Sequence, residues 1–135
     1  MTKTNRQTTA ALAVLILLQG VMLSALYAGI PPHPPEATPL FGIAPFIGAA
    51  TAIALAAILV DPLASREGRW LSLLAAVLGL VSFGPQKFLD AQFGLIWPAV
   101  ILGQLAAFVI VANLVKALRS QDAGAVQLSP EGGAA

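Results

Sequence analysis

Two short polar segments interrupt an otherwise apolar chain, and they hold the side chains best suited to chemistry. One reads FGPQKFLDAQFG and carries Gln86, Lys87 and Asp90. The other reads PPHPPEATP and carries His33 and Glu36. Histidine and carboxylates serve as general acids and bases, and they also ligate metals in mixed nitrogen and oxygen sites. A site of either kind would need both segments to meet on one face.

The two segments predict a binding surface more readily than a catalytic or metal centre. Its residues are His33, Glu36, Gln86, Lys87, Asp90 and Trp97. Three ligands from two loops, without a recognised spacing, do not define a metal site, so we predict no metal and no catalytic residue. Lys87 and Asp90 are three residues apart and would simply pair on a helical turn. We interpret the segment around them as a polar cap between two helices, with a ligand or partner site as the alternative.

The composition indicates a membrane protein. Hydrophobic residues make up 58% of the 135 residues and charged residues 10%, whereas soluble domains are nearer half apolar and a quarter charged. The net charge of +1 gives no reason to expect a nucleic-acid partner. The chain has no cysteine, which excludes disulfides, thiolate ligands and cysteine nucleophiles. No cofactor is predicted.

The apolar residues fall into blocks that predict an all-α integral membrane four-helix bundle. A membrane-spanning helix needs about 20 apolar residues. The expected spans are residues 8–28, 40–60, 65–84 and 94–115. They would form two hairpins that each run from inside to outside and back. Residues 1–7 are then an N-terminal tail, and residues 119–135 are expected to be a disordered C-terminal tail.

The basic residues predict the orientation. Six of the seven lie in the two tails and the middle loop: Lys3, Arg6, Arg66, Arg69, Lys116 and Arg119. The positive-inside rule places that side in the cytoplasm. We therefore expect a multi-pass protein of the cytoplasmic (inner) membrane with both termini cytoplasmic. The two polar segments would face outward.

The two hairpins share a pattern that predicts a parallel internal repeat, although any helical hairpin tends to have Gly and Pro at its mouth. Each returning helix carries a proline shortly after a Phe-Gly pair, Pro45 in one and Pro98 in the other. Because proline suits the first turn of a helix, we expect helices to begin or bend there. The two helix ends would frame an outer cavity with a floor of Phe41, Phe93 and Trp97.

Three amides lie within the spans. Gln19 and Gln104 sit near mid-span, and burying an amide without a partner is costly. We expect both to face the bundle interior and the first and fourth helices to be neighbours. An alternative is that they line a substrate path. Asn113 is half a turn out of phase with Gln104 and is expected to meet water or headgroups.

Small residues recur at helical spacing, three or four apart, in every span, which favours close helix packing or an oligomer face. The stripes are Gly20, Ser24 and Ala28; Gly48, Ala52 and Ala56; Ser72, Ala76 and Gly79; and Ala99, Gly103 and Ala107. We predict an accessory or assembly subunit of a membrane complex. Its partners would be membrane lipids and either copies of itself or a larger complex. A small dimeric transporter or channel lined by Gln19 and Gln104 is the first alternative, and a membrane enzyme with an outer-face site is the second.

Overall fold

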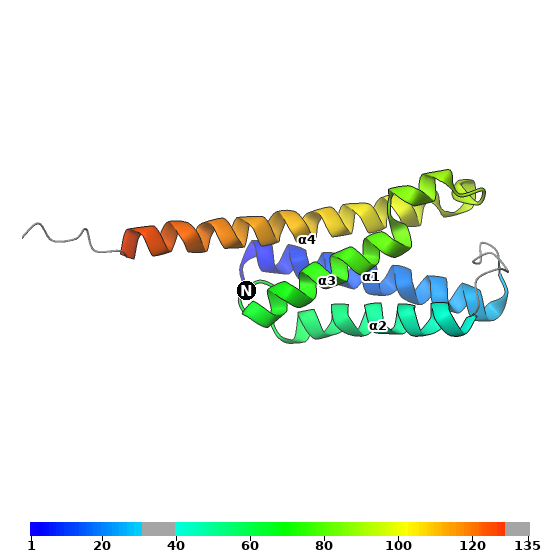
Figure 1. Ribbon diagram of the computed structural model, residues 1–135, viewed down its shortest axis with the longest axis horizontal. Coiled ribbons are helices and arrows are strands. Elements are labelled where there is room, and N and C mark those ends of the chain that lie inside the picture. The colour runs from blue at the N-terminus through cyan, green and yellow to red at the C-terminus, as the bar shows by residue number, and fades with distance from the viewer. Residues whose placement is uncertain (31–39, 129–135) are drawn as a thin grey trace, which may run out of the picture.

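The protein is an all-α four-helix bundle, as the sequence predicts (Figure 1). The computed structural model describes residues 1–30 and 40–128. Its elements are α1 (Lys3–Ala28), α2 (Leu40–Leu59), α3 (Arg66–Phe83), the 3-10 helix η1 (Pro85–Leu89) and α4 (Phe93–Leu128). Within the described residues, four helical segments are long and apolar enough to cross a membrane. This confirms a multi-pass membrane architecture.

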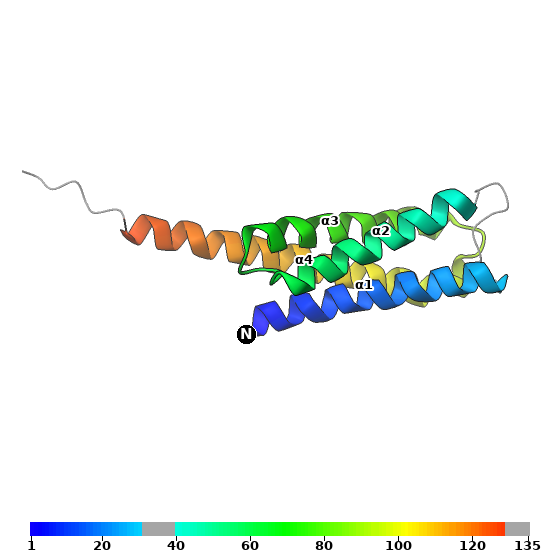
Figure 2. The same cartoon turned by 90° about the horizontal axis from the view of Figure 1, so that it is seen from below.

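The helices alternate in direction and pack in a ring. Each helix packs along the next one in the chain, and α4 returns to pack along α1, while α2 and α4 lie diagonally opposite (Figures 1 and 2). Short connections between antiparallel neighbours are typical of such bundles. The ring gives the molecule two ends. We call the end with the start of α1 and the α2–α3 loop the inner end, and the end with η1 the outer end.

Small side chains allow the helices to approach closely. The core consists of a few large residues set among alanines: Leu12, Leu15, Ile47, Val100 and Ile110. An added Cβ at Gly79 would lie 3.0 Å from Leu15 Cδ2, and one at Gly103 would lie 2.6 Å from Phe83 Cβ. The small-residue stripes of α3 and α4 are therefore used inside the bundle.

Local hydrogen bonds set the ends of the helices. Thr2 Oγ1 accepts the Asn5 backbone N–H at 3.2 Å and caps α1. Gly29 ends that helix with a left-handed φ of 63°, a conformation that costs glycine little. Ser65 caps α3 by accepting the Gly68 backbone N–H at 2.8 Å. These caps satisfy groups that a helix end otherwise leaves without partners.

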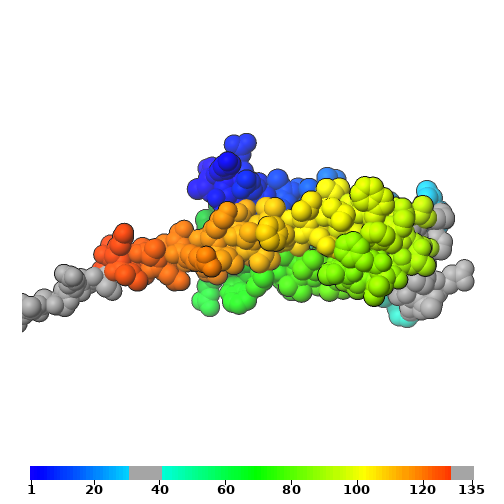
Figure 3. Space-filling view, turned by 90° about the horizontal axis from the view of Figure 1, so that it is seen from above, coloured from blue at the N-terminus to red at the C-terminus, as the bar shows by residue number. Residues whose placement is uncertain are grey.

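Both tails are more helical than expected. α1 begins at Lys3 rather than at Thr8, and α4 runs to Leu128. The expected disorder of the C-terminal tail is thus wrong for residues 119–128, while 129–135 lie outside the described residues. At about 1.5 Å per residue the 36 residues of α4 extend about 54 Å, well beyond the membrane core of about 30 Å. Figures 1 and 3 show α4 projecting past the other helices at the inner end.

The two prolines lie in matching places in their helices, and two of the residues expected to floor a cavity between them are exposed. Pro45 and Pro98 are each the sixth residue of their helix, α2 or α4. This agrees with an internal repeat, which stays a prediction. The side chain of Phe41 is 82% exposed and that of Trp97 is 52% exposed. Both are open to the surroundings, and His33 of the predicted rim lies outside the described residues, so the outer cavity stays a prediction.

Candidate functional site

The outer polar segment forms a compact turn, and Gln86 closes the end of α3. Its Nε2 donates to the carbonyl oxygens of Leu80 at 3.0 Å and Val81 at 2.8 Å. These carbonyls lie in the last turn of α3, where a helix lacks its own donors. The Gln86 amide is therefore a helix cap, and a ligand would have to displace it.

Lys87 and Asp90 pair with each other, as their spacing predicts. The Lys87 Nζ lies 3.6 Å from Asp90 Oδ2. Asp90 Oδ1 also accepts the Gln92 backbone N–H at 2.9 Å, and its carbonyl accepts the Phe93 N–H at 3.0 Å. Asp90 thus stabilises the turn that leads into α4. A partly exposed ion pair of this kind is worth about 0–1 kcal/mol, so the segment is built as a turn between two helices.

The remaining outer-face residues do not join this turn. His33 and Glu36 lie outside the described residues, so an acid–base or metal site drawn from them and Asp90 stays a prediction. Trp97 lies one turn into α4 with its ring exposed. Within residues 1–30 and 40–128, no three His, Cys, Asp or Glu side chains come together as a metal site would need.

The two mid-span glutamines both contact α3. Gln19 on α1 is 2% exposed, and Ser82 Oγ lies 3.2 Å from its Nε2 and 3.4 Å from its Oε1. Gln104 is half-buried on α4 and donates from Nε2 to the carbonyl of Phe83 at 3.2 Å. The expected proximity of α1 and α4 is confirmed. The two amides do not bind each other; they bind adjacent residues near the end of α3, which packs along α4 and lies diagonally opposite α1.

We expect Gln19 and Ser82 to stabilise the bundle as a pair. Gln19→Leu and Ser82→Ala should each lower stability, and the double variant should lose less than their sum. Coupling across helices in a membrane averages about 0.6 kcal/mol and reaches about 1.7 kcal/mol. Unfolding in detergent would measure it. Ser24→Ala is the control, because among the described residues the Ser24 hydroxyl bonds only to Gly20 of its own helix. Strict additivity between Gln19→Leu and Ser82→Ala would contradict the pair.

The inner end holds a hydrogen-bonded cluster that the sequence did not single out. The side chain of Asn5 is 7% exposed, and its Nδ2 donates to Asp61 Oδ1 at 2.8 Å. This bond ties α1 to the α2–α3 loop, where Asp61 has a left-handed φ of 70°. Asp61 Oδ1 also accepts the Ala64 N–H at 3.3 Å. Asn5 Oδ1 has no hydrogen-bond partner among the described residues.

Asn113 belongs to the same inner end, and its expected exposure to water is wrong. It is 3% exposed, and its Nδ2 donates to Thr4 O at 3.3 Å and to Thr8 Oγ1 at 3.2 Å. The Thr8 hydroxyl in turn donates to Thr4 O at 3.0 Å. Asn113 is seven residues after Ala106 and three after Ile110, which are both buried. This helical spacing places Asn113 on the same face as those two residues, and it could have predicted that Asn113 is buried.

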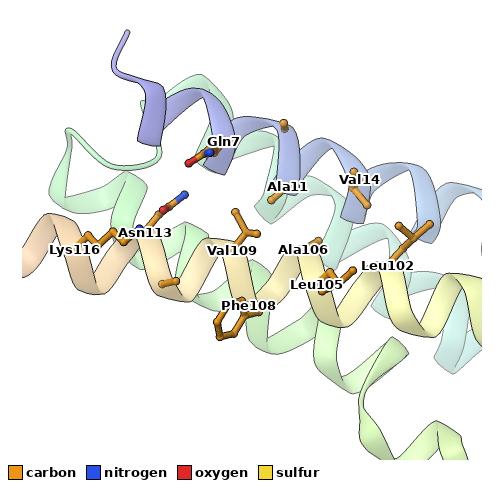
Figure 4. Close-up of a pocket in the computed structure, with 12 residues that line it drawn as sticks. Gln7, Ala11, Val14, Leu102, Leu105, Ala106, Phe108, Val109, Asn113 and Lys116 are labelled. Atoms are coloured by element: carbon orange, nitrogen blue, oxygen red, sulfur yellow. The ribbon is translucent and has the colours of Figure 1, made fainter.

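A groove runs between α1 and α4 on the inner half of the molecule (Figure 4). Its volume is about 480 Å³, within the usual range of ligand pockets of about 300–1,000 Å³. Alanines from both helices line it: Ala10, Ala11, Ala106 and Ala112. Its polar residues are Gln7, Asn113 and Lys116, all near the inner end. The remaining walls are apolar.

Comparison with known proteins adds no functional assignment. The chain matches no protein-family model, no curated protein and no solved structure. The function must therefore be argued from the surfaces that the bundle leaves uncovered.

Proposed function

We propose that the protein is an accessory or assembly subunit of a membrane complex, and that α1 and α2 bind a helix of a partner. One observation carries this proposal. The small-residue stripes of α3 and α4 are largely buried inside the bundle, whereas those of α1 and α2 are largely exposed. An added Cβ at Gly20 or Gly48 would meet no atom within 4 Å. Two helix surfaces suited to close packing are thus left uncovered by the described residues.

Small residues matter here because lipid provides no hydrophobic drive for helices to associate. Association then depends on close van der Waals contact between backbones, which Gly20 and Gly48 permit. Each glycine lies eight residues from the outer end of its helix, α1 or α2. The Ser24 hydroxyl donates to the Gly20 carbonyl at 2.8 Å, so this polar residue can face lipid until a partner binds.

The alternatives draw less support from the contacts. A transporter or channel would use Gln19 and Gln104 to line a path, but both amides are bonded to α3. An enzyme would use Lys87 and Asp90, which pair with each other. The projecting end of α4 offers a further contact for a partner at the inner face.

We expect the complex to depend on the α1 and α2 stripes. Native mass spectrometry after mild extraction should show a heteromeric assembly. Gly20→Leu with Gly48→Leu should dissociate it while the thermal midpoint of the isolated chain stays close to wild type, since both sites open away from the bundle. Val77→Leu, on an exposed part of α3, is the matched control. A monomer would contradict the proposal, and a homodimer would favour the transporter.

The orientation that we propose places the inner end in the cytoplasm of a cell with a bacterial-type inner membrane. Support comes from six of the seven basic residues, which lie at the start of α1, at the α2–α3 junction and along the inner part of α4. The positive-inside rule relates such an excess to the cytoplasmic side.

A reporter that is active only in the cytoplasm should therefore be active when fused after Leu128. The same reporter inserted at residues 34–37 should be inactive. Enzyme activity in cells measures both fusions, and immunoblotting controls for their amounts. The reverse pattern would overturn the orientation and leave the bundle itself unaffected.

A further inference from the structure

We propose that the α1–α4 groove binds one anionic phospholipid from the membrane leaflet at the inner end. An acyl chain would lie along the alanines, and the phosphate would meet Lys116 and Gln7. This site is separate from the α1 and α2 stripes and does not depend on a partner helix, but the choice of an anionic lipid rests on the proposed cytoplasmic placement of the inner end.

The polarity of the groove matches the layers of a leaflet. Gln7 and Lys116 lie at its inner end, on α1 and α4, and both are exposed (Figure 4). The walls deeper in the membrane are apolar, from Val14 on α1 to Leu102 on α4. A phospholipid has the same order, with a charged headgroup at the surface and hydrocarbon beneath it.

The length of the groove argues for a lipid rather than a helix. Lys116 and Leu102 are fourteen residues apart on α4, which corresponds to about 21 Å along the helix. Half of a bilayer, with its headgroup layer, is about 20–22 Å thick. A partner helix that crosses the membrane would need a groove along the full core of about 30 Å. The α1–α4 groove stops near the middle.

The charge at the inner end favours an anionic headgroup. No residue that lines the groove is acidic. Lys116 makes no ion pair among the described residues, whose ion pair joins Lys87 and Asp90 at the other end. Anionic lipids carry the negative potential of the cytoplasmic leaflet, and a nearby basic residue strengthens binding to them. Lys116 is therefore placed to select for negative charge.

The test compares retention of phosphatidylglycerol and phosphatidylcholine by the full chain. Purified protein is exchanged into mixed micelles of the two lipids and examined by native mass spectrometry. We expect one phosphatidylglycerol per chain, retained about fivefold over phosphatidylcholine, the effect of one basic residue near an anionic surface. Lys116→Gln should remove this preference. Arg119→Gln makes the same change of charge outside the groove lining and should retain it.

A second variant tests the apolar part of the groove. Ala112→Phe should fill the groove and lower retention of both lipids, while Val111→Phe, outside the lining, should not. The thermal midpoint confirms that each variant is folded. Equal retention of the two lipids by wild type, or an unchanged preference in Lys116→Gln, would overturn the proposal. So would a stable dimer with a helix of the second copy cross-linked into this groove.

Discussion

Gly68→Ala should lower the free energy of unfolding by about 1–3 kcal/mol, the usual cost of overpacking. Gly68 is buried in the first turn of α3, under the α2–α3 loop. A Cβ there would collide with the carbonyl oxygen of Asp61 and would lie 2.7 Å from Ser65 Oγ. Neither atom can move aside easily, because Ser65 caps α3 and donates to the Val60 carbonyl at 2.7 Å. Thermal unfolding in detergent measures the loss.

Gly124→Ala is the matched control. Gly124 lies in the projecting part of α4, and an added Cβ meets nothing within 4 Å. Alanine favours a helix over glycine by up to about 1 kcal/mol, so this change should leave stability unchanged or raise it. Equal stability of the Gly68→Ala and Gly124→Ala variants would show that the α2–α3 loop is not packed against α3 as described.

Asn5→Asp should destabilise the protein by about 2–4 kcal/mol at neutral pH. Asn5 Nδ2 donates to the carboxylate of Asp61 at 2.8 Å, and losing a hydrogen bond to a charged group costs about 1.5–3 kcal/mol. The new carboxylate also repels Asp61, and this repulsion is weakened because Asp61 is exposed. Unfolding of the purified chain at low and high salt would separate the lost hydrogen bond from the charge repulsion, since salt should weaken only the repulsion.

The control for charge is Gln7→Glu, half a turn away on the same helix. Gln7 is exposed, and surface substitutions usually change stability by no more than about 0.5 kcal/mol. Asn5→Ala separates the two contributions, because it removes the hydrogen bond without adding a charge. If Asn5→Asp is no worse than Asn5→Ala, the two side chains do not lie in contact at the inner end.

The bundle itself was predictable because lipid imposes strong rules on a sequence. Backbone groups must be satisfied within each span, so blocks of about 20 apolar residues predict helices. The expected limits agree with α2 to within one residue, 40–60 against Leu40–Leu59. The polar end of α4 was missed, because half of residues 119–128 are polar or charged and they lack an apolar block. Composition alone did not reveal that a long helix continues into them.

The sequence drew attention to the outer end of the molecule and did not reveal the hydrogen bonds at the inner end. Lys87 and Asp90 stand out because their neighbours are apolar, yet in the structure they only form and cap a turn. Asn5, Asp61 and Asn113 lie near the ends of apolar blocks, where polar residues are ordinary. Asn5 bonds to Asp61, 56 positions away, and Asn113 bonds to Thr4 and Thr8, 109 and 105 positions away. No local sequence pattern encodes contacts over such separations.

The uncovered small-residue stripes are the feature of the fold on which the proposed subunit role rests. A chain that buried all four stripes would have little reason to associate further in lipid. Here α3 and α4 use theirs within the bundle, while Gly20 and Gly48 remain open on α1 and α2. The described residues thus leave two small-residue helix surfaces uncovered, which is the basis for the proposal that the chain joins a larger assembly.

Photo-cross-linking from single positions in the native membrane most directly tests the claim that the α2 stripe binds a partner helix. A photoreactive residue replaces Ala52 on the α2 stripe or, as the control, Val77 on α3. We predict that position 52 gives one discrete adduct with a different membrane polypeptide, that Gly48→Leu abolishes it, and that position 77 gives lipid adducts alone. Lipid adducts alone from both positions, or an adduct of the chain with itself, would contradict the account.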